Sequence, residues 1–533
     1  MLSYSQGPDD QLWEFTIGQA LDRAVERWGG SEALVSCHQS QRYTWRQLRD
    51  AADGLARGLA SLGDRVGVWS TNCAEWVLVH MACARAGAAL VNVNPAYRRH
   101  EVAFTLQKSR MKVLFLWKGD ARSDYAEILA SARSGHGLSL EHAIFFGSDE
   151  WDALRTASGE IDEPRDPDDV ANIQYTSGTT GQPKGVMLTH RNQLNNGKLL
   201  AWGMRYTERD RICVPVPLYH CFGCVIGTMS ALASGAAMIL PNWTFDPGAT
   251  LKAVQAERAT SLYGVPAMFI AELGLPDFEA HDLSSLRTGM MAGAPCPVQV
   301  MRRVMCEMHC SELTIGYGQT ESSPVVTMSM PDDPVDLRVA TIGKALPCTE
   351  IKIVSVLDGE TLPIGEQGEV CARGYMVMKG YDGEPEATAR AIDPEGWLHT
   401  GDLGLMHEDG YLHLTGRAKD MIIRGGENVY PREVEEFLYT HPKVAEVQVV
   451  GIPDERLGEV VVAWIRLKAE ENSSEEEIRK FCEGQIAYFK VPQYVRFVEQ
   501  FPMTVTGKIQ KFRIREIETT DRCLEKVAKQ ETA

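Results

Sequence analysis

Helix-like and strand-like patterns alternate along the first 150 residues, and this alternation restricts the chain to few architectures. Amphipathic stretches at 12–28 and 45–62 predict helices, and an alanine-rich segment at 75–86 predicts a third. Short apolar runs predict strands at 65–69, 89–93 and 113–117. Because strands that alternate with crossover helices pair in parallel, the sequence predicts an α/β unit with a largely parallel sheet.

Later segments extend this organisation and then change it. Strands at 236–240 and 261–265 and helices at 251–257 and 297–307 continue the alternation. Runs separated by glycine- and proline-rich turns predict an antiparallel subdomain with strands at 350–354, 368–372 and 411–414. A compact α+β pattern follows, with helices at 431–440 and 474–487 and strands at 444–451 and 459–467. We therefore expect a large N-terminal domain, 1–416, of layered α/β subdomains and an antiparallel subdomain, a hinge at 417–420 and a small α+β domain at 421–533.

Composition excludes several classes of function. The chain has 533 residues and a formal net charge of -18, which argues against a general nucleic-acid or membrane-surface binder. The N-terminus resembles neither a secretory signal nor a transit peptide, and thirteen scattered cysteines suggest no disulfide framework. An uncharged stretch between His220 and Pro241 contains several glycines and serines, so we expect a buried helix and strand there rather than a membrane span. We expect a cytoplasmic protein.

The strongest local signal is a loop at 176–185 that suits phosphate binding. Three glycines let backbone N–H groups approach phosphate oxygens, four hydroxyls can donate, and one lysine supplies charge. The spacing differs from a Walker A loop. Strand-like residues flank the loop on both sides, which predicts a hairpin-like loop rather than a strand-to-helix loop. An exposed glycine–threonine turn is the alternative. The predicted ATP-binding residues here are Thr176, Ser177, Gly178, Thr179, Thr180, Gly181, Gln182, Pro183 and Lys184.

This loop resembles the signature loop of the adenylate-forming superfamily, which includes acyl-CoA synthetases, luciferases and peptide-synthetase adenylation domains. Five later segments match the family's motifs in the family's order: Gly293–Pro295, Tyr317–Glu321, Thr400–Asp402, Gly416–Asp420 and Pro502–Lys508. Each short motif is weak alone, but the ordered set spans more than three hundred residues and is very specific. The resemblance implies an ATP-dependent, AMP-forming acid–thiol ligase that makes an acyl-adenylate and then an acyl-CoA.

The resemblance also implies roles for the residues of these motifs. Tyr317 would stack on adenine, Thr320 would bind the α-phosphate, and Glu321 would hold Mg²⁺, a hard oxygen-seeking ion. Asp402 and Arg417 would contact the ribose, and Arg417 also phosphate. The remaining nucleotide contacts would come from Gly293, Ala294, Pro295 and Gly318. In isolation, each of these residues would be interpreted as part of an ordinary turn or as a surface charge.

The C-terminal motifs imply roles in both steps of the chemistry. The lysine that matches Lys508 bridges the acid carboxylate and the α-phosphate in this family, and a cation there neutralises charge as two anions meet. Lys419 falls where the family has its hinge, so the small domain is expected to be mobile. Gly425 and Gly426 resemble the glycines that line the passage for the pantetheine arm of CoA.

The acid pocket is expected to include His220, Phe222 and Val265, by family position. Amino-acid-activating relatives have an aspartate in this region, and its absence favours an uncharged acyl chain. His220 would gate the site or stack on the acid, with a structural histidine as the alternative. The apolar surroundings favour a medium-length or branched fatty acid, and the chain resembles the medium-chain acyl-CoA synthetase branch.

Other functions stay open at this stage. An aryl or small acid is an alternative substrate, and a stand-alone adenylation enzyme or luciferase-like protein would use another acceptor. The Cys221–Cys224 pair and the group of Cys306, His309 and Cys310 lack a second pair at zinc-site spacing, so we expect buried apolar cysteines and no structural metal. The expected ligands are a carboxylic acid, ATP, Mg²⁺ and CoA, with a homodimer as a further expectation.

Overall fold

The computed structural model describes residues 1–60, 62–133, 139–161, 166–176, 183–294, 296–417, 420–425, 427–454, 456–503 and 509–524. They form two compact units. The larger unit comprises Ser5–Ile351 and Cys371–His399, and the smaller unit comprises Met1–Tyr4, Lys352–Val370 and Thr400–Ala533. The predicted hinge at 417–420 includes two residues outside the described set, so the domain boundary stays a prediction.

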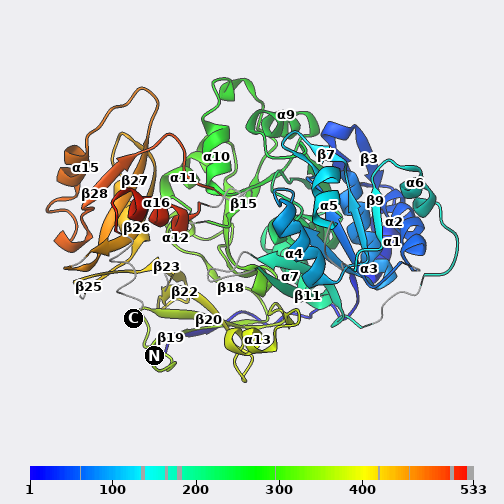
Figure 1. Ribbon diagram of the computed structural model, residues 1–533, viewed down its shortest axis with the longest axis horizontal. Coiled ribbons are helices and arrows are strands. Elements are labelled where there is room, and N and C mark those ends of the chain that lie inside the picture. Colours follow the sequence, from blue (N-terminus) through cyan, green and yellow to red (C-terminus); the bar gives the residue numbers. More distant parts are fainter. Residues whose placement is uncertain are drawn as a thin grey trace. The chain divides into compact units, whose positions relative to one another are not determined.

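Two sheets form the framework of the larger unit (Figure 1). One has seven strands in the order β21 (Gly380–Tyr381), β11 (Lys184–Thr189), β10 (Val170–Thr176), β5 (Ala89–Val93), β4 (Arg65–Trp69), β6 (Val113–Leu116) and β9 (His142–Phe145). The other has nine, in the order β18 (Lys344–Ala345), β17 (Val325–Met328), β16 (Glu312–Gly318), β15 (Thr288–Ala292), β14 (Ser261–Gly264), β12 (Arg211–Cys213), β13 (Ala237–Leu240), β2 (Glu32–Ser36) and β3 (Gln41–Thr44).

The central strands of both sheets are parallel, which confirms the predicted α/β fold. Strand β4 pairs in parallel with β5 and β6, and β10 pairs in parallel with β5. In the second sheet, β12 to β16 are parallel, and antiparallel pairs occur only toward the edges, where β17 follows β16 and β3 follows β2. The carboxyl ends of β14, β15 and β16 therefore lie at one edge.

Helix α3 (Ala74–Ala86) shows why the two sheets share a core. Its residues from Ala74 to Arg85 are all buried, as expected for a helix that is mostly apolar around its whole circumference. One core cluster joins this helix to Val66 and Val68 of β4 and to Leu34 of β2, so side chains of both sheets meet around it. Further helices of the larger unit are α1 (Ile17–Trp28), α2 (Trp45–Leu59), α4 (Arg99–Ser109), α5 (Tyr125–Arg133), α6 (Asp149–Arg155), α7 (His190–Gly203), α8 (Thr228–Ser234), α9 (Pro247–Glu257), α10 (Pro266–Leu273), α11 (Val298–Glu307), α12 (Val335–Ala340) and α13 (Pro385–Ala391).

The remaining strands agree with the predicted antiparallel and α+β regions. A five-stranded sheet has the order β1 (Tyr4–Gln6), β19 (Thr349–Val354), β20 (Gly368–Gly374), β22 (Leu398–Met406) and β23 (Leu412–Arg417), and its last two strands are antiparallel. The C-terminal sheet contains β25 (Glu427–Val429), β24 (Ile422–Arg424), β27 (Gly458–Leu467), β26 (Val444–Asp454) and β28 (Tyr494–Phe497). Its helices are α14 (Pro431–Leu438), α15 (Glu475–Cys482) and α16 (Lys511–Asp521).

Two predicted helices are too long by five residues at one end, and the helix expected at 45–62 ends at Leu59. The helix expected at 12–28 begins at Ile17, because Thr16 and Gln19 form a reciprocal capping box. The helix expected at 474–487 ends at Cys482, and Gly484 has a positive φ of 70°. The uncharged stretch is a buried π-helix, Phe222–Gly227, followed by α8 and β13. Among the described helices, none is long and apolar enough to cross a lipid bilayer.

Glu272 on α10 is a fully buried carboxyl group in the core of the larger unit. It is 1% exposed, and neither carboxyl oxygen has a hydrogen-bond partner among the described residues. Burial raises the pKa of Glu272 well above its usual value, because the charged form loses its hydration. The native state therefore retains this proton at a pH at which the unfolded chain has released it.

Replacing Glu272 with glutamine is expected to stabilise the protein increasingly as pH rises. Below the unfolded pKa of about 4.3 both side chains are neutral, so the two proteins should have similar stability. As pH rises toward the raised folded pKa, the wild type loses stability and the variant does not, with a difference of about 1–3 kcal/mol. Thermal unfolding midpoints at pH 5.5, 7 and 8.5 would measure the difference. A gap that stays constant across this range would contradict a buried proton on Glu272.

Candidate active site

The predicted phosphate loop is flanked by two antiparallel strands of the seven-stranded sheet. Strands β10 and β11 pair with Tyr175 opposite Gly185 and Thr176 opposite Lys184. This confirms that the flanking structure is strand–loop–strand rather than strand–loop–helix. Residues 177–182 lie outside the described residues, so the predicted contacts of Ser177, Gly178, Thr179, Thr180, Gly181 and Gln182 stay predictions.

A tyrosine, Tyr381, lies between Lys184, at the far end of that loop, and the predicted metal ligand Glu321. The Lys184 Nζ atom is 4.8 Å from the centre of the Tyr381 ring, and the Tyr381 hydroxyl donates to Glu321 Oε1 at 3.0 Å. Burial and the Glu321 carboxylate both raise the pKa of Tyr381, so this hydroxyl stays protonated and keeps donating. Tyr381 was not predicted. It reaches the site because β21 pairs with β11, a contact between distant segments with no local sequence signal.

The carboxyl ends of three parallel strands carry predicted nucleotide and acid contacts. Val265 directly follows β14, Gly293 follows β15, and Tyr317 lies near the end of β16. Ligands of open parallel sheets bind at such carboxyl ends. Any larger residue at Gly318 would require the backbone to move, because its Cβ atom would lie 1.8 Å from the Pro324 carbonyl oxygen. Ala294, the residue after Gly293, belongs to the described residues, whereas Pro295 lies outside them.

The predicted acid pocket touches the predicted phosphate-binding motif. Cys221 Sγ lies 3.8 Å from Thr320 Oγ1 and 3.5 Å from Nδ1 of the preceding His220. The Phe222 backbone N–H donates to the same Nδ1 at 3.2 Å, so the neutral imidazole has its proton on Nε2. Phe222 is buried, and its ring centre is 5.6 Å from that of Tyr263 on β14. A π-helix begins at Phe222, a distortion that is frequent at functional sites.

In the smaller unit, the two predicted ribose ligands are paired with each other. Asp402 and Arg417 are opposite residues of β22 and β23, and Arg417 Nε donates to Asp402 Oδ1 at 3.0 Å. Asp402 is buried, whereas the Arg417 side chain is 48% exposed, so the arginine has room to contact a ligand as well. Gly425 is described with a φ of 61°. Lys419, Gly426 and Lys508 lie outside the described residues.

The cysteines form no disulfide, and most of those singled out in the sequence are buried. Cys221, Cys224 and Cys310 are buried as expected, but Cys306 on α11 is exposed, because it lies on the solvent side of an amphipathic helix.

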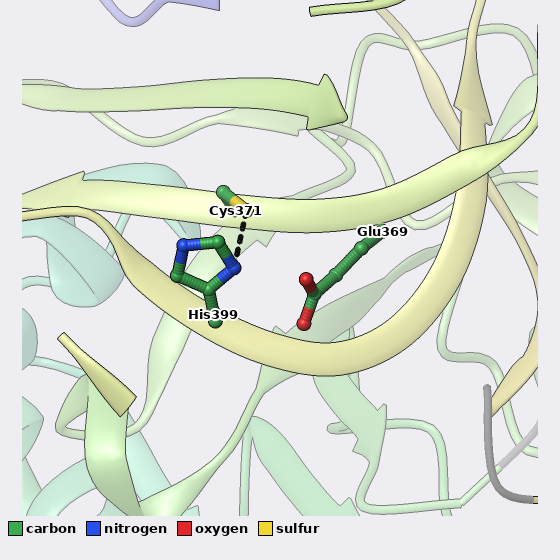
Figure 2. A group of neighbouring side chains, drawn as sticks. All are labelled: Glu369, Cys371 and His399. Atoms are coloured by element: carbon green, nitrogen blue, oxygen red, sulfur yellow. Dashed lines mark hydrogen bonds between the residues drawn. The ribbon is translucent and has the colours of Figure 1, made fainter. Parts of the chain in front are cut away.

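A different group, Glu369, Cys371 and His399, offers carboxylate, thiol and imidazole donors from β20 and β22 (Figure 2). Cys371 Sγ lies 3.5 Å from His399 Nδ1, and Glu369 accepts a hydrogen bond from the Gly401 N–H. The absence of a structural metal stays a prediction.

Comparison with known proteins gives a family match over most of the chain. The model of the AMP-binding enzyme family matches residues 21–382, and the model of the AMP-binding enzyme C-terminal domain matches residues 433–508. The two matches together contain most of the predicted site residues, including Lys184, Thr320, Glu321 and Lys508.

Individual relatives match over nearly their full length. A Bacillus subtilis protein named as an acyl-CoA synthetase, YngI, is 46% identical over 95% of this chain and 97% of its own. The mitochondrial medium-chain acyl-CoA ligase ACSF2 of Bos taurus is 41% identical over 96% of this chain and 89% of its own. The solved structure of the anthranilate CoA ligase AuaEII, in complex with anthranoyl-AMP, aligns with a TM-score of 0.87 at 28% identity, covering 95% of this chain and 97% of that one.

Proposed function

Because this chain belongs to the family of AMP-binding enzymes, we propose that it joins a medium-chain or branched fatty acid to CoA through an acyl-adenylate. The reaction class, an AMP-forming acyl-CoA synthetase, agrees with the relatives named above and confirms the prediction from sequence. The preference for a medium-length acid is supported by the 41% identity to a medium-chain ligase and by the buried, apolar Phe222 and Val265.

One contact in the larger unit supports the proposal most directly. Thr320, proposed to bind the α-phosphate, lies within 3.8 Å of Cys221, next to His220 of the proposed acid pocket. Adenylation requires the acid carboxylate to meet the α-phosphorus, so both ligands must be held at neighbouring positions. The adjacency of these two segments provides such an arrangement.

The proposed mechanism has two group transfers. In the first, an oxygen of the acid carboxylate attacks the α-phosphorus of ATP, the bond to pyrophosphate breaks, and a mixed anhydride forms. Thr320 and the 176–184 loop would hold phosphate oxygens, and Lys508 would neutralise charge where the two anions meet. In the second, the CoA sulfur attacks the acyl carbonyl, the bond to the AMP oxygen breaks, and the thiol proton is released.

Mg²⁺ would be held by Glu321, whose carboxylate is the type of oxygen ligand that this ion prefers. When bound, the ion would neutralise negative charge on the phosphate oxygens. The structure is compatible with this role, because Glu321 Oε1 accepts a hydrogen bond from Tyr381 that orients the carboxylate.

Asp402 and Arg417 are proposed ribose contacts, Gly425 and Gly426 line the proposed CoA passage, and Lys419 is the proposed hinge. A cytoplasmic location and a homodimer remain predictions.

A panel of acids tests the proposed function. AMP release that requires both ATP and CoA would be measured with straight C2–C16, branched and aryl acids. We expect the highest kcat/KM with a medium-length or branched aliphatic acid, because an apolar pocket binds acyl methylenes by removing them from water. Preference for an aryl acid would overturn the substrate assignment, and absence of AMP release with every acid would overturn the reaction class.

A further inference from the structure

Three buried side-chain amides, hydrogen-bonded in a row and named here the amide chain, lie next to the segment that carries His220 and Phe222. Its members are Gln174 and Asn172 on β10 and Asn92 on β5, and each is less than 5% exposed. Gln174 is opposite Asn92 in the parallel pairing of the two strands, and Asn172 is two residues before Gln174, so all three side chains share one face of the sheet. Buried amides are costly unless they are hydrogen-bonded, so their contacts explain what they do.

The amides donate to one another in a single direction. Gln174 Nε2 donates to Asn172 Oδ1 at 2.7 Å, and Asn172 Nδ2 donates to Asn92 Oδ1 at 2.9 Å. Asn92 Nδ2 then donates to the backbone carbonyl of Tyr219 at 3.0 Å. The amide chain thus begins on the strand that leads into the phosphate loop and ends on the residue before His220. Bonds in such a chain polarise and strengthen one another.

The amide chain also contacts the π-helix that begins at Phe222. Gln174 Nε2 lies 3.2 Å from Cys224 Sγ, and Asn92 Nδ2 lies 3.7 Å from the same sulfur. The segment 216–222, named here the His220 segment, is therefore bonded to β5 through Tyr219, and Cys224, just after the segment, contacts both β5 and β10. The beginning of the segment is fixed separately, because the Asn72 side chain accepts from Leu218 N–H at 2.8 Å and donates to the Val216 carbonyl at 3.0 Å.

We propose that Asn92 is a positioning residue for the carboxylic acid, because it holds the His220 segment against the strand that leads into the phosphate loop. This inference rests on the proposed function. Asn92 does not need to touch the acid. It sets where His220 and Phe222 lie, and a displacement of these groups weakens binding of the acid without changing the groups that hold ATP.

The test replaces Asn92 with leucine, which has a similar size and cannot donate to Tyr219. Loss of the buried hydrogen bonds that Asn92 donates to Tyr219 and accepts from Asn172 is expected to raise KM for the best acid about tenfold, while KM for ATP stays within about twofold of the wild type. The preferred acyl chain length should also shift. Asn195→Leu is the matched control, since Asn195 is a buried amide that bonds the Trp13 backbone and lies outside the amide chain. It is expected to lower the unfolding midpoint without changing the ratio of the two KM values.

Equal changes in both KM values, or an unchanged KM for the acid in a folded Asn92→Leu protein, would overturn the proposal. If Asn92→Leu does not fold, Asn92→Ser is judged by the same ratio, because serine keeps a donor but is too short to reach Tyr219. The wild-type enzyme is assayed first with the acid panel. Absence of AMP release at that stage contradicts the proposed function, whereas a normal wild type with an unshifted KM ratio in the variant contradicts only the role of Asn92.

Discussion

Replacement of Lys508 with alanine is expected to slow acyl-adenylate formation by about 10²-fold or more, while thioester formation from pre-made acyl-adenylate stays near the wild-type rate. The acid carboxylate and the α-phosphate are both anions, so their approach concentrates negative charge that a cation between them offsets. The second transfer starts from a mixed anhydride in which the acid has already lost its charge. A cation at this position therefore contributes mainly to the first transfer.

Two assays separate the transfers. Pyrophosphate release with acid and ATP measures adenylation, and acyl-CoA formation from synthetic acyl-adenylate and CoA measures thioester formation. Lys480→Ala is a matched control, because Lys480 is an exposed lysine of α15 in the same region of the chain, and it is expected to leave both rates unchanged. A similar loss in both transfers for Lys508→Ala would contradict a role confined to adenylation and would indicate a general defect.

Much of the fold could be predicted because the decisive signals are local. The helix expected at 75–86 is observed as Ala74–Ala86, and the strands expected at 65–69 and 89–93 are observed with the same bounds. Alternation of helices and strands then implies parallel pairing, since parallel strands need a crossover connection. The start of α1 was missed although its signal was present: Thr16 and Gln19 have the spacing of a capping box, which outweighs the apolar pattern before it.

Parts of the candidate site have no local signal. Tyr381 contacts Glu321 because a two-residue strand pairs with β11, and nothing near residue 380 indicates that pairing. The amide chain is equally hidden, because its members read as isolated polar residues within apolar strands until β5 and β10 are placed side by side. Sequence motifs identified the residues proposed to contact ligands, whereas the residues that orient them depend on pairing between distant segments.

Glu321→Gln is expected to lower the adenylation rate at a fixed, limiting Mg²⁺ concentration by about 10²-fold or more, since a metal ion supplies several kcal/mol of charge stabilisation at a transferring phosphoryl group. Glutamine keeps the size of the side chain and an oxygen that can accept from the Tyr381 hydroxyl. It removes the negative charge, and Mg²⁺ prefers charged oxygen ligands. The Mg²⁺ concentration that gives half the maximal rate should therefore rise.

Tyr381→Phe separates this charge from the hydrogen bond that orients it. Among the described residues, the bond that the variant removes is the 3.0 Å bond to Glu321 Oε1, a net loss of about 1 kcal/mol. The rate is therefore expected to fall by less than about tenfold with little change in Mg²⁺ dependence. Titration of both variants and the wild type with MgCl₂ at saturating acid and ATP gives the comparison. A Glu321→Gln enzyme that titrates at the same Mg²⁺ concentration as the wild type would show that this carboxylate orients Tyr381 and does not bind the metal.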